Sequence, residues 1–356
     1  MMIKKNLKKF DIALFIKIFN IFLSICFTFI FSSLLILAAG ASPVNVFITI
    51  FKGTWTAYDR IAEICVKAIP LILAGIGVSV AFRGGFWNIG AEGQLYAGAT
   101  AAAVTGILIQ WNSPALLLIV IVISFISGAF WAFIPGLLKA VLNINEVILT
   151  MMMNYIAIYI ASYVCHGPFR DTHGYLPQTQ EISQGAMLPV IMERTRLHAG
   201  IIIALLCSLI IYFLFSRTVA GYNIRVSGAS PRAAFYGGIN VSATLLLTAC
   251  VSGGMCGLAG MGDVCGIHHR LLDGISPGYG YTAIIIALLG RLHPAGVVIS
   301  AIVFASLEIG AGFMQRTTGI PSSLVSVIES MMVIFILGSE ILEKKLIRLW
   351  QSRFLQ

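Results

Sequence analysis

The feature that most constrains the fold is the stretch from residue 93 to residue 138, which contains no charged side chain. A helix needs about 20 apolar residues to cross a bilayer, so this stretch is too long for one crossing. Trp111-Asn112-Ser113-Pro114 places turn-forming residues near its middle. A water-soluble fold has no place for so much continuous apolar surface, because its exterior must stay hydrated. The stretch therefore predicts two membrane-spanning helices.

The composition of the whole chain agrees with this interpretation. Of the 356 residues, 58% are hydrophobic and only 10% are charged, against about 25% charged residues in ordinary soluble domains. The mean hydropathy is +0.94. Disordered and coiled-coil chains carry far more charge, and a β-barrel alternates apolar and polar residues in stretches of about ten. We predict an all-α polytopic membrane protein.

Charges, prolines and glycines divide the apolar runs into about ten transmembrane helices. These are expected at residues 18–39, 61–82, 90–110, 114–138, 146–164, 197–216, 241–262, 279–292, 295–314 and 322–341. The single transmembrane domain then covers residues 18–341, between a basic N-terminal segment (1–17) and a basic C-terminal segment (342–356). The first run alternatively resembles a signal peptide, because Ala39-Gly40-Ala41 is typical of a cleavage site, but its length favours an uncleaved span.

The distribution of basic residues predicts the orientation. With both termini in the cytoplasm, roughly twice as many Lys and Arg residues fall on the inner side as on the outer side, as the positive-inside rule requires. The largest outer loop is then 165–196, and the largest inner loop is 217–240. This bias accounts for the net charge of +9, so membrane lipid is an expected partner and nucleic acid is not.

Small residues recur at helical spacing in two of the expected spans. Gly98, Ala102 and Gly106 form one such stripe, and Ala249, Gly253 and Gly257 form another. Small side chains let two transmembrane helices approach closely. We expect both stripes to be packing surfaces.

No motif for an enzymatic activity is present. The chain has no Gly-Lys dipeptide and so no GxxxxGK[ST] phosphate-binding loop, and it has neither HExxH nor GxSxG. The pair His268-His269 lacks a third ligand at a useful spacing, and the seven cysteines form no CxxC. We predict a non-enzymatic chain with no catalytic residue, no metal site and no bound cofactor.

The first segment with functional character runs from Arg83 to Gln94. It places Asn88, Glu92 and Gln94 among glycines, between two apolar runs. Polar groups inside a membrane are costly and usually functional, and irregular backbone survives there only when it is buried in protein or lines a cavity. The segment is either partly re-entrant and functional or a glycine-rich cytoplasmic turn.

A second segment of this kind, residues 270–282, follows the seventh expected span as the first follows the second. The two preceding spans run in opposite directions. Glycine-interrupted segments at corresponding places in two inverted halves indicate a transport pathway. Glu308, inside the ninth span, either lines a polar cavity or pairs with a neighbour, as does Glu329 in the tenth. The predicted pathway residues are Trp87, Asn88, Glu92, Gln94, Ser276, Tyr279 and Glu308.

The inner loop 217–240 contains the pattern of a short capped helix. Ser230 is a favourable N-cap and Pro231 a favourable first residue, and Gly237-Gly238 would end the helix after Tyr236. Such a helix facing the cytoplasm is either a docking element or a structured loop without a partner. The residues assigned to docking are Ser230, Pro231, Arg232, Ala233, Ala234 and Gly237.

Residues 86–94, with the sequence FWNIGAEGQ, resemble the FNIGAEGQ signature of bacterial ABC-importer permeases of the nucleoside and simple-sugar group, within the ribose and branched-chain amino acid permease family. The resemblance extends from about residue 60 to 340. Departures from the pattern are Trp87, where Phe is more usual, and Ser230, where Asn is common. Further similar segments are PGLLK (135–139), NEVI (145–148), MNY (153–155), GASPRAA (228–234), SPGY (276–279) and ALLGR (287–291).

The resemblance implies a transport subunit in a bacterial cell membrane. It implies a cytoplasmic ATPase that binds ATP and Mg²⁺, a second homologous permease subunit and an extracytoplasmic substrate-binding lipoprotein. The loop 217–240 would be the coupling element that docks on the ATPase. Nucleosides, purine ones especially, are the expected substrates, and simple sugars such as ribose are the alternative. An ion-coupled secondary transporter and a membrane scaffold are more remote alternatives.

Overall fold

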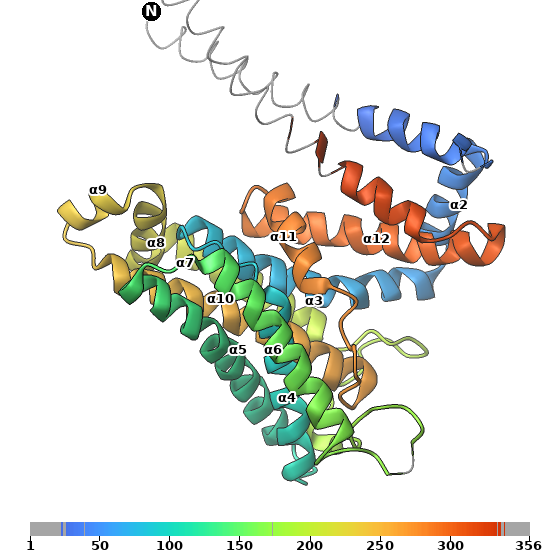
Figure 1. Ribbon diagram of the computed structural model, residues 1–356. Coiled ribbons are helices and arrows are strands. Elements are labelled where there is room, and N and C mark those ends of the chain that lie inside the picture. Colours follow the sequence, from blue (N-terminus) through green and yellow to red (C-terminus); the bar gives the residue numbers. More distant parts are fainter. Residues whose placement is uncertain are drawn as a thin grey trace, which may run out of the picture. The chain divides into compact units, whose positions relative to one another are not determined.

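The computed structural model describes residues 23, 26–38, 40–172, 174–332, 334, 335 and 338, and Figure 1 shows it as a ribbon. The chain divides into two compact units, one of residues 61–305 and one formed by residues 1–60 together with 306–356. Most of the described residues are helical, and their only β-structure consists of isolated bridges such as Arg170–Thr179. The predicted all-α class is confirmed.

The larger unit contains most of the helices. Their bounds are α3 Tyr58–Arg83, α4 Ala91–Leu108, α5 Pro114–Leu142, α6 Glu146–His166, α7 Gly200–Arg217, α8 Val219–Ala229, α9 Pro231–Tyr236, α10 Val241–Asp263, α11 Tyr279–Leu289 and the first half of α12 Pro294–Thr318. A turn of 3₁₀ helix, Gln184–Ala186, lies in the loop before α7, and a π-helical turn, Val264–His268, extends α10.

Local capping sets where these helices begin and end. The side chains of Ser113, Asn145 and Asn240 accept hydrogen bonds from backbone N–H groups in the first turns of α5, α6 and α10. Each such side chain satisfies a donor that the helix itself leaves free. Asn143 takes the left-handed conformation at the end of α5 (φ 52°), which gives a sharp break before α6.

The core of the larger unit is built on close helix contacts. α10 packs most extensively against α5 and α4, while α3 is almost completely buried. Gly98 of α4 and Gly128 of α5 both contact the backbone of α10 at Gly257, where a side chain would overlap the neighbouring helix. The predicted packing role of Gly98 and Gly257 is confirmed.

Six described helices are long and apolar enough to cross a membrane, or seven if the bent pair Cys26–Ala38 and Pro43–Trp55 counts as one span. The prediction of a multi-pass membrane protein is therefore confirmed, whereas the number of ten spans is not. The expected span 279–292 is the 11-residue helix α11, which is short for a crossing. The expected spans 18–39 and 322–341 lie partly outside the described residues.

The smaller unit has a hydrophobic core of its own. Ile36, α2 (Pro43–Trp55), the second half of α12 and the short helix Ser323–Met332 contribute to it. Its buried residues are Ile36, Val46, Ile50, Ala311, Met314, Val325 and Ile328. The helix α2 is not among the expected spans, and Ser42-Pro43 forms its N-terminal boundary.

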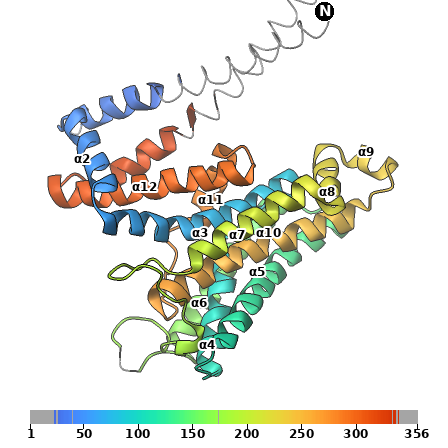
Figure 2. The same ribbon diagram turned by 180° about the vertical axis from the view of Figure 1, so that it is seen from behind.

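Within the larger unit, the two main loops lie at opposite ends of the helices. α8 and α9 lie at one end, and the chain between α6 and α7 lies at the other, as both Figure 1 and the reverse view in Figure 2 show. The loops 217–240 and 165–196 therefore lie on opposite sides of this unit, and the assignment of the first to the cytoplasm stays a prediction.

Candidate functional site

The segment between α3 and α4 is an irregular turn with a buried polar centre. Gly85 has φ +77°, a conformation that favours glycine. Asn88 and Gln94 are completely buried and exchange two hydrogen bonds of 2.9 Å through their side-chain amides. Asn88 also donates to Ser252 Oγ of α10 at 2.9 Å. The two amides therefore fix the start of α4 against α10.

One face of α6 supplies hydrogen-bond partners to the same turn. Glu146, Thr150 and Asn154 follow each other at four-residue spacing, and all three are buried. Their oxygens accept hydrogen bonds from the backbone N–H groups of the turn, from Trp87 to Glu146 Oε1 at 3.5 Å and from Gly93 to Asn154 Oδ1 at 2.8 Å. Backbone groups that α3 and α4 leave unpaired are thereby satisfied away from water.

Asn154 makes three side-chain hydrogen bonds, all to residues outside α6. Besides the bond from Gly93, its amide donates to Ile89 O at 3.0 Å and to the hydroxyl of Tyr281 at 3.3 Å. Sequence reasoning missed this face of α6. The signal was available, as three polar residues at i, i+4 and i+8 in an otherwise apolar helix.

Replacing Asn154 with Leu is expected to lower the thermal unfolding midpoint of the purified complex by several degrees. The change leaves the Gly93 N–H and the Ile89 carbonyl unpaired in a buried site, at a cost of about 3 kcal/mol. Met152→Leu is the matched control, because Met152 lies on the exposed face of the same helix. Equal midpoints for the two variants would show that Asn154 does not hold the turn.

Glu92 joins the two glycine-interrupted segments. It lies in the first turn of α4 and is 3% exposed, and its Oε2 accepts a hydrogen bond of 2.7 Å from the backbone N–H of Gly280 in the first turn of α11. The Ser276 side chain also hydrogen-bonds Glu92, and Ser276 Oγ accepts from the N–H of Tyr279 at 3.1 Å. A carboxylate is favourable at a helix N-terminus. The structure thus brings Glu92, Ser276 and Tyr279 together.

The remaining predicted pathway residues occupy different surroundings. Trp87 is 54% exposed and packs on Phe82, with ring centroids 4.8 Å apart. Tyr279 is buried, and its hydroxyl accepts a hydrogen bond of 2.9 Å from Lys67 Nζ. Glu308 belongs to the smaller unit, where its charge acts on Glu329.

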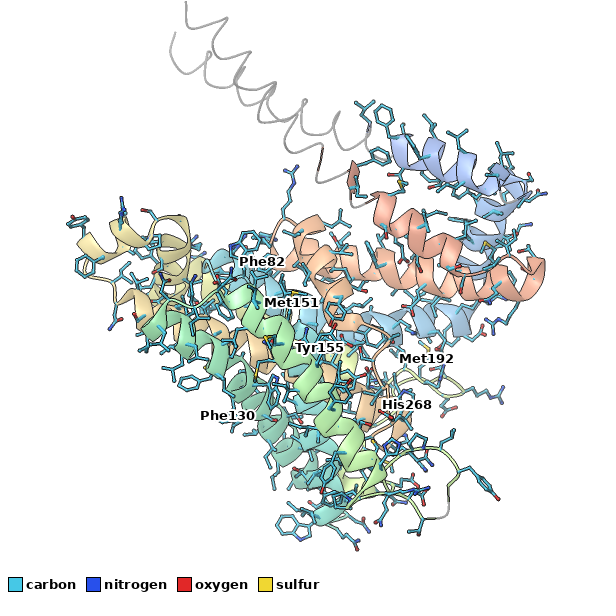
Figure 3. All side chains as sticks on the ribbon, viewed as in Figure 1. Phe82, Phe130, Met151, Tyr155, Met192 and His268 are labelled. Carbon is cyan, nitrogen blue, oxygen red and sulfur yellow. The ribbon has the colours of Figure 1, made fainter. Side chains whose placement is uncertain are left out.

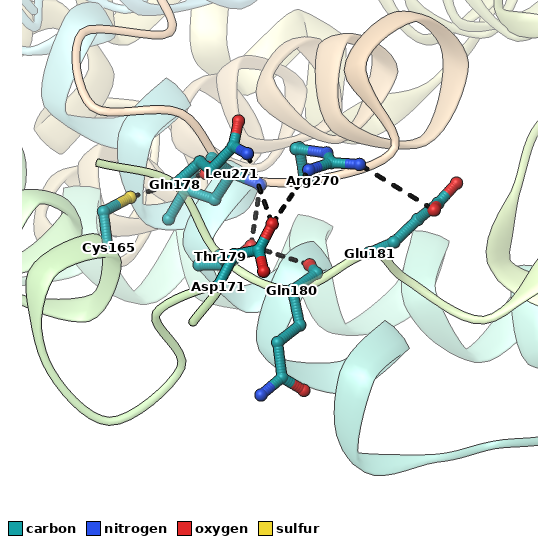
Figure 4. A network of polar contacts seen from close by, with 8 residues as sticks. All are labelled: Cys165, Asp171, Gln178, Thr179, Gln180, Glu181, Arg270 and Leu271. Carbon is teal, nitrogen blue, oxygen red and sulfur yellow. Dashed lines mark hydrogen bonds and ion pairs between the residues drawn. The ribbon is translucent and has the colours of Figure 1, made fainter. Parts of the chain in front are cut away.

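The loop 165–196 is fastened to the segment that leads into α11, as Figure 4 shows. Arg270 contacts Asp171 at 3.4 Å and Glu181 at 3.8 Å. The backbone N–H of Thr179 donates to Leu271 O at 2.9 Å, and the Leu271 N–H donates to Thr179 Oγ1 at 3.0 Å. These contacts hold residues 171–181 over the lead-in to α11.

A second ion pair anchors the end of the same loop. Arg196 makes two hydrogen bonds to the carboxylate of Glu63, at 2.7 and 2.9 Å. The hydrogen bond with Glu63 raises the pKa of Arg196 above its ordinary value. The bidentate geometry fixes the loop to the beginning of α3.

At the opposite end of the unit, α9 has the capped form that the sequence predicts. Ser230 Oγ accepts a hydrogen bond of 3.3 Å from Ala233 N, Pro231 is the first residue, and the helix ends at Tyr236 before Gly237. Arg232, Ala233, Phe235 and Tyr236 are exposed, whereas Ala234 is completely buried. Ala234, one of the residues assigned to docking, is therefore not on the surface of α9.

Comparison with known proteins identifies relatives along most of the chain. The guanosine ABC transporter permease protein NupP of Bacillus subtilis is 33% identical over 86% of this chain and 89% of its own length. The nucleoside ABC transporter permease protein NupB of Lactococcus lactis subsp. cremoris is 31% identical over 90% and 91%. The glucose ABC transporter permease protein TsgB13 of Haloferax volcanii is 31% identical over 87% and 84%. No solved structure matches the chain.

The family model for the permease component of branched-chain amino acid transport systems matches residues 60–337. These residues include both glycine-interrupted segments, the polar face of α6 and the helix α9. The chain therefore belongs to this family of ABC transporter permeases and is a multi-pass membrane protein.

Proposed function

We propose that the chain is the transmembrane permease subunit of an ABC importer and forms part of the translocation pathway for nucleosides, with purine nucleosides as the main class. The observation that carries the transport role is the hydrogen bond between Glu92 and Gly280, which ties two interrupted segments together inside the larger unit. Broken helices joined at a buried polar site are typical of substrate pathways.

The choice of substrate is supported by the relatives. Of the three relatives described above, two are named for guanosine or nucleosides and the third is named for glucose. Simple sugars are therefore the second candidate. A purine nucleoside offers flat apolar faces and polar edges, so it suits a pathway with exposed aromatic rings.

The proposal includes the partners and the arrangement in the membrane. A cytoplasmic ATPase binds ATP and Mg²⁺ and docks on α9, a second homologous permease completes the pathway, and an extracytoplasmic lipoprotein delivers substrate. We propose ten spans in two inverted halves within residues 18–341, with the segments 1–17 and 342–356 in the cytoplasm. Both of these terminal segments lie outside the described residues.

Uptake of radiolabelled guanosine by cells that express the complete importer tests this function. We expect uptake that excess unlabelled nucleoside inhibits and that ribose, glucose and amino acids do not. Uptake should continue when an ionophore collapses the proton gradient, provided that ATP is kept constant. Inhibition by glucose alone would support the sugar alternative, and loss of uptake with the gradient would indicate an ion-coupled transporter.

The orientation is tested with single cysteines in a cysteine-free chain. We expect Tyr175→Cys, in the outer loop, to react with a membrane-impermeant thiol reagent in intact cells. Tyr236→Cys, on α9, should react only after the membrane is opened. Both side chains are highly exposed, at 102% and 88%, so lack of reaction would not be due to burial. The reverse pattern would contradict the proposed topology.

A further inference from the structure

The exposed face of α6 carries three tyrosine hydroxyl groups among exposed apolar side chains such as Met152 and Ile156. Tyr155, Tyr159 and Tyr163 follow each other at four-residue spacing and are 59%, 72% and 70% exposed. Tyr163 lies near the end of α6, where an aromatic residue at the membrane interface is ordinary. Tyr155 lies near the middle of the 21-residue helix and Tyr159 one turn further. Two phenol groups at that depth are unfavourable in lipid.

The exposed face of the neighbouring helix α5 has the apolar chemistry that contact with lipid favours. The large exposed side chains in the middle of α5 are Leu118, Val122, Ile126 and Phe130, which are 55–65% exposed and carry no polar atom. Figure 3 labels Phe130 on α5 and Tyr155 on α6. The two helices are adjacent in the chain, and only α6 exposes hydroxyl groups near its middle, so this difference in chemistry indicates different surroundings.

The tyrosines of α6 are continuous with the candidate site. Asn154, next to Tyr155, hydrogen-bonds Tyr281 of α11, which is 41% exposed. Further along α6, Ser162 donates to Asp273 at 3.3 Å in the segment that leads into α11. One polar edge therefore runs from the middle of α6 along the second interrupted segment.

We infer that Tyr155, Tyr159 and Tyr281, here called the tyrosine face, line the substrate pathway and contact the flat ring of a nucleobase. The inference rests on the proposed function and names residues for its substrate site. The face is exposed in a single chain because a second permease would enclose the pathway. Asn88 and Gln94, in contrast, satisfy each other inside the protein and position the backbone of the turn.

The chemistry of the tyrosine face fits an uncharged aromatic substrate. Offset stacking of two aromatic rings contributes about 0.5–1.5 kcal/mol beyond the area that it buries. The phenol hydroxyl can donate to or accept from the polar edge of a base and from ribose hydroxyls.

The first test compares leucine substitutions in the complete importer. Tyr155→Leu and Tyr159→Leu should each raise the KM for radiolabelled guanosine by about 3- to 10-fold, the loss of one stacking contact, with the maximal rate little changed. Tyr155→Phe keeps the ring and should have a smaller effect. Phe130→Leu, on the exposed apolar side of α5, is the matched control and should leave the KM unchanged. Unchanged KM values for both tyrosine variants would contradict the inference.

The second test measures water access and does not depend on which substrate is carried. In a cysteine-free chain, Tyr155→Cys and Tyr159→Cys should react with a small, charged, membrane-impermeant thiol reagent, at least about tenfold faster than Phe130→Cys. Guanosine should protect the two positions. Reaction rates no higher than that of Phe130→Cys, or cross-linking to the second permease without reaction, would overturn the inference. If the wild-type importer takes up glucose and not guanosine, the proposed substrate is wrong, while the labelling rates still show whether the face lines a water-filled path.

Discussion

Ala233→Trp is expected to remove the ATPase from the purified importer and to abolish uptake. Ala233 is exposed on α9, between the exposed side chains of Arg232 and Phe235. An indole ring at this position would overlap any partner that approaches the helix closely. A loss of at least about 2 kcal/mol at a docking contact corresponds to roughly 30-fold weaker binding. The measurement is the amount of ATPase that co-purifies with the tagged permease, together with guanosine uptake.

The structure also decides which position of α9 can test docking. Ala234 is completely buried within the chain, so Ala234→Trp would disturb the packing of α9 and lose the ATPase for that reason alone. A matched control is Ala115→Trp, because Ala115 is exposed at the start of α5, at the end of the unit opposite α9. Normal co-purification and uptake by the Ala233→Trp chain would show that α9 is not the docking element.

Much of the helical framework could be predicted from the sequence, because charges and helix-breaking residues bound the apolar runs. The expected span 114–138 corresponds to α5, Pro114–Leu142, and the expected span 146–164 corresponds to α6, Glu146–His166. The cap at Ser230 was also predicted, since a polar cap followed by proline is a local signal. Local patterns of this kind depend on a few neighbouring residues only.

Features that depend on distant contacts could not be predicted. Glu92 and Gly280 are far apart in the sequence, and nothing near either residue indicates that a carboxylate of α4 meets the first turn of α11. In the same way, the burial of Ala234 follows from packing and not from the composition of α9. These are consequences of tertiary structure, which hydropathy does not encode. Helix α2 was not among the expected spans, because its 13 residues are too few for a membrane crossing.

The residues predicted to line a pathway illustrate the same limit. Polar residues within a membrane segment indicate a functional region, and Asn88, Glu92 and Gln94 do lie in one polar cluster. Polarity alone does not distinguish a side chain that faces a pathway from one that holds the backbone around it. The hydrogen bonds of Asn88 and Gln94 are directed to each other and to neighbouring protein groups.

Glu92→Ala is expected to reduce guanosine uptake by about 10- to 100-fold while the importer still assembles. The change removes the acceptor for the Gly280 N–H and the partner of Ser276. Leaving a buried donor unpaired costs about 1–3 kcal/mol, and each 1.4 kcal/mol is a factor of ten. Because α11 is short and this contact holds its first turn, its start should lose its fixed position beside α4. Glu92→Gln keeps an oxygen acceptor and should retain part of the uptake, whereas Glu193→Ala, at an exposed position of the loop 165–196, should retain nearly all of it. Wild-type uptake by the Glu92→Ala importer would show that the link between α4 and α11 is not needed for transport, and would remove both interrupted segments from the proposed mechanism.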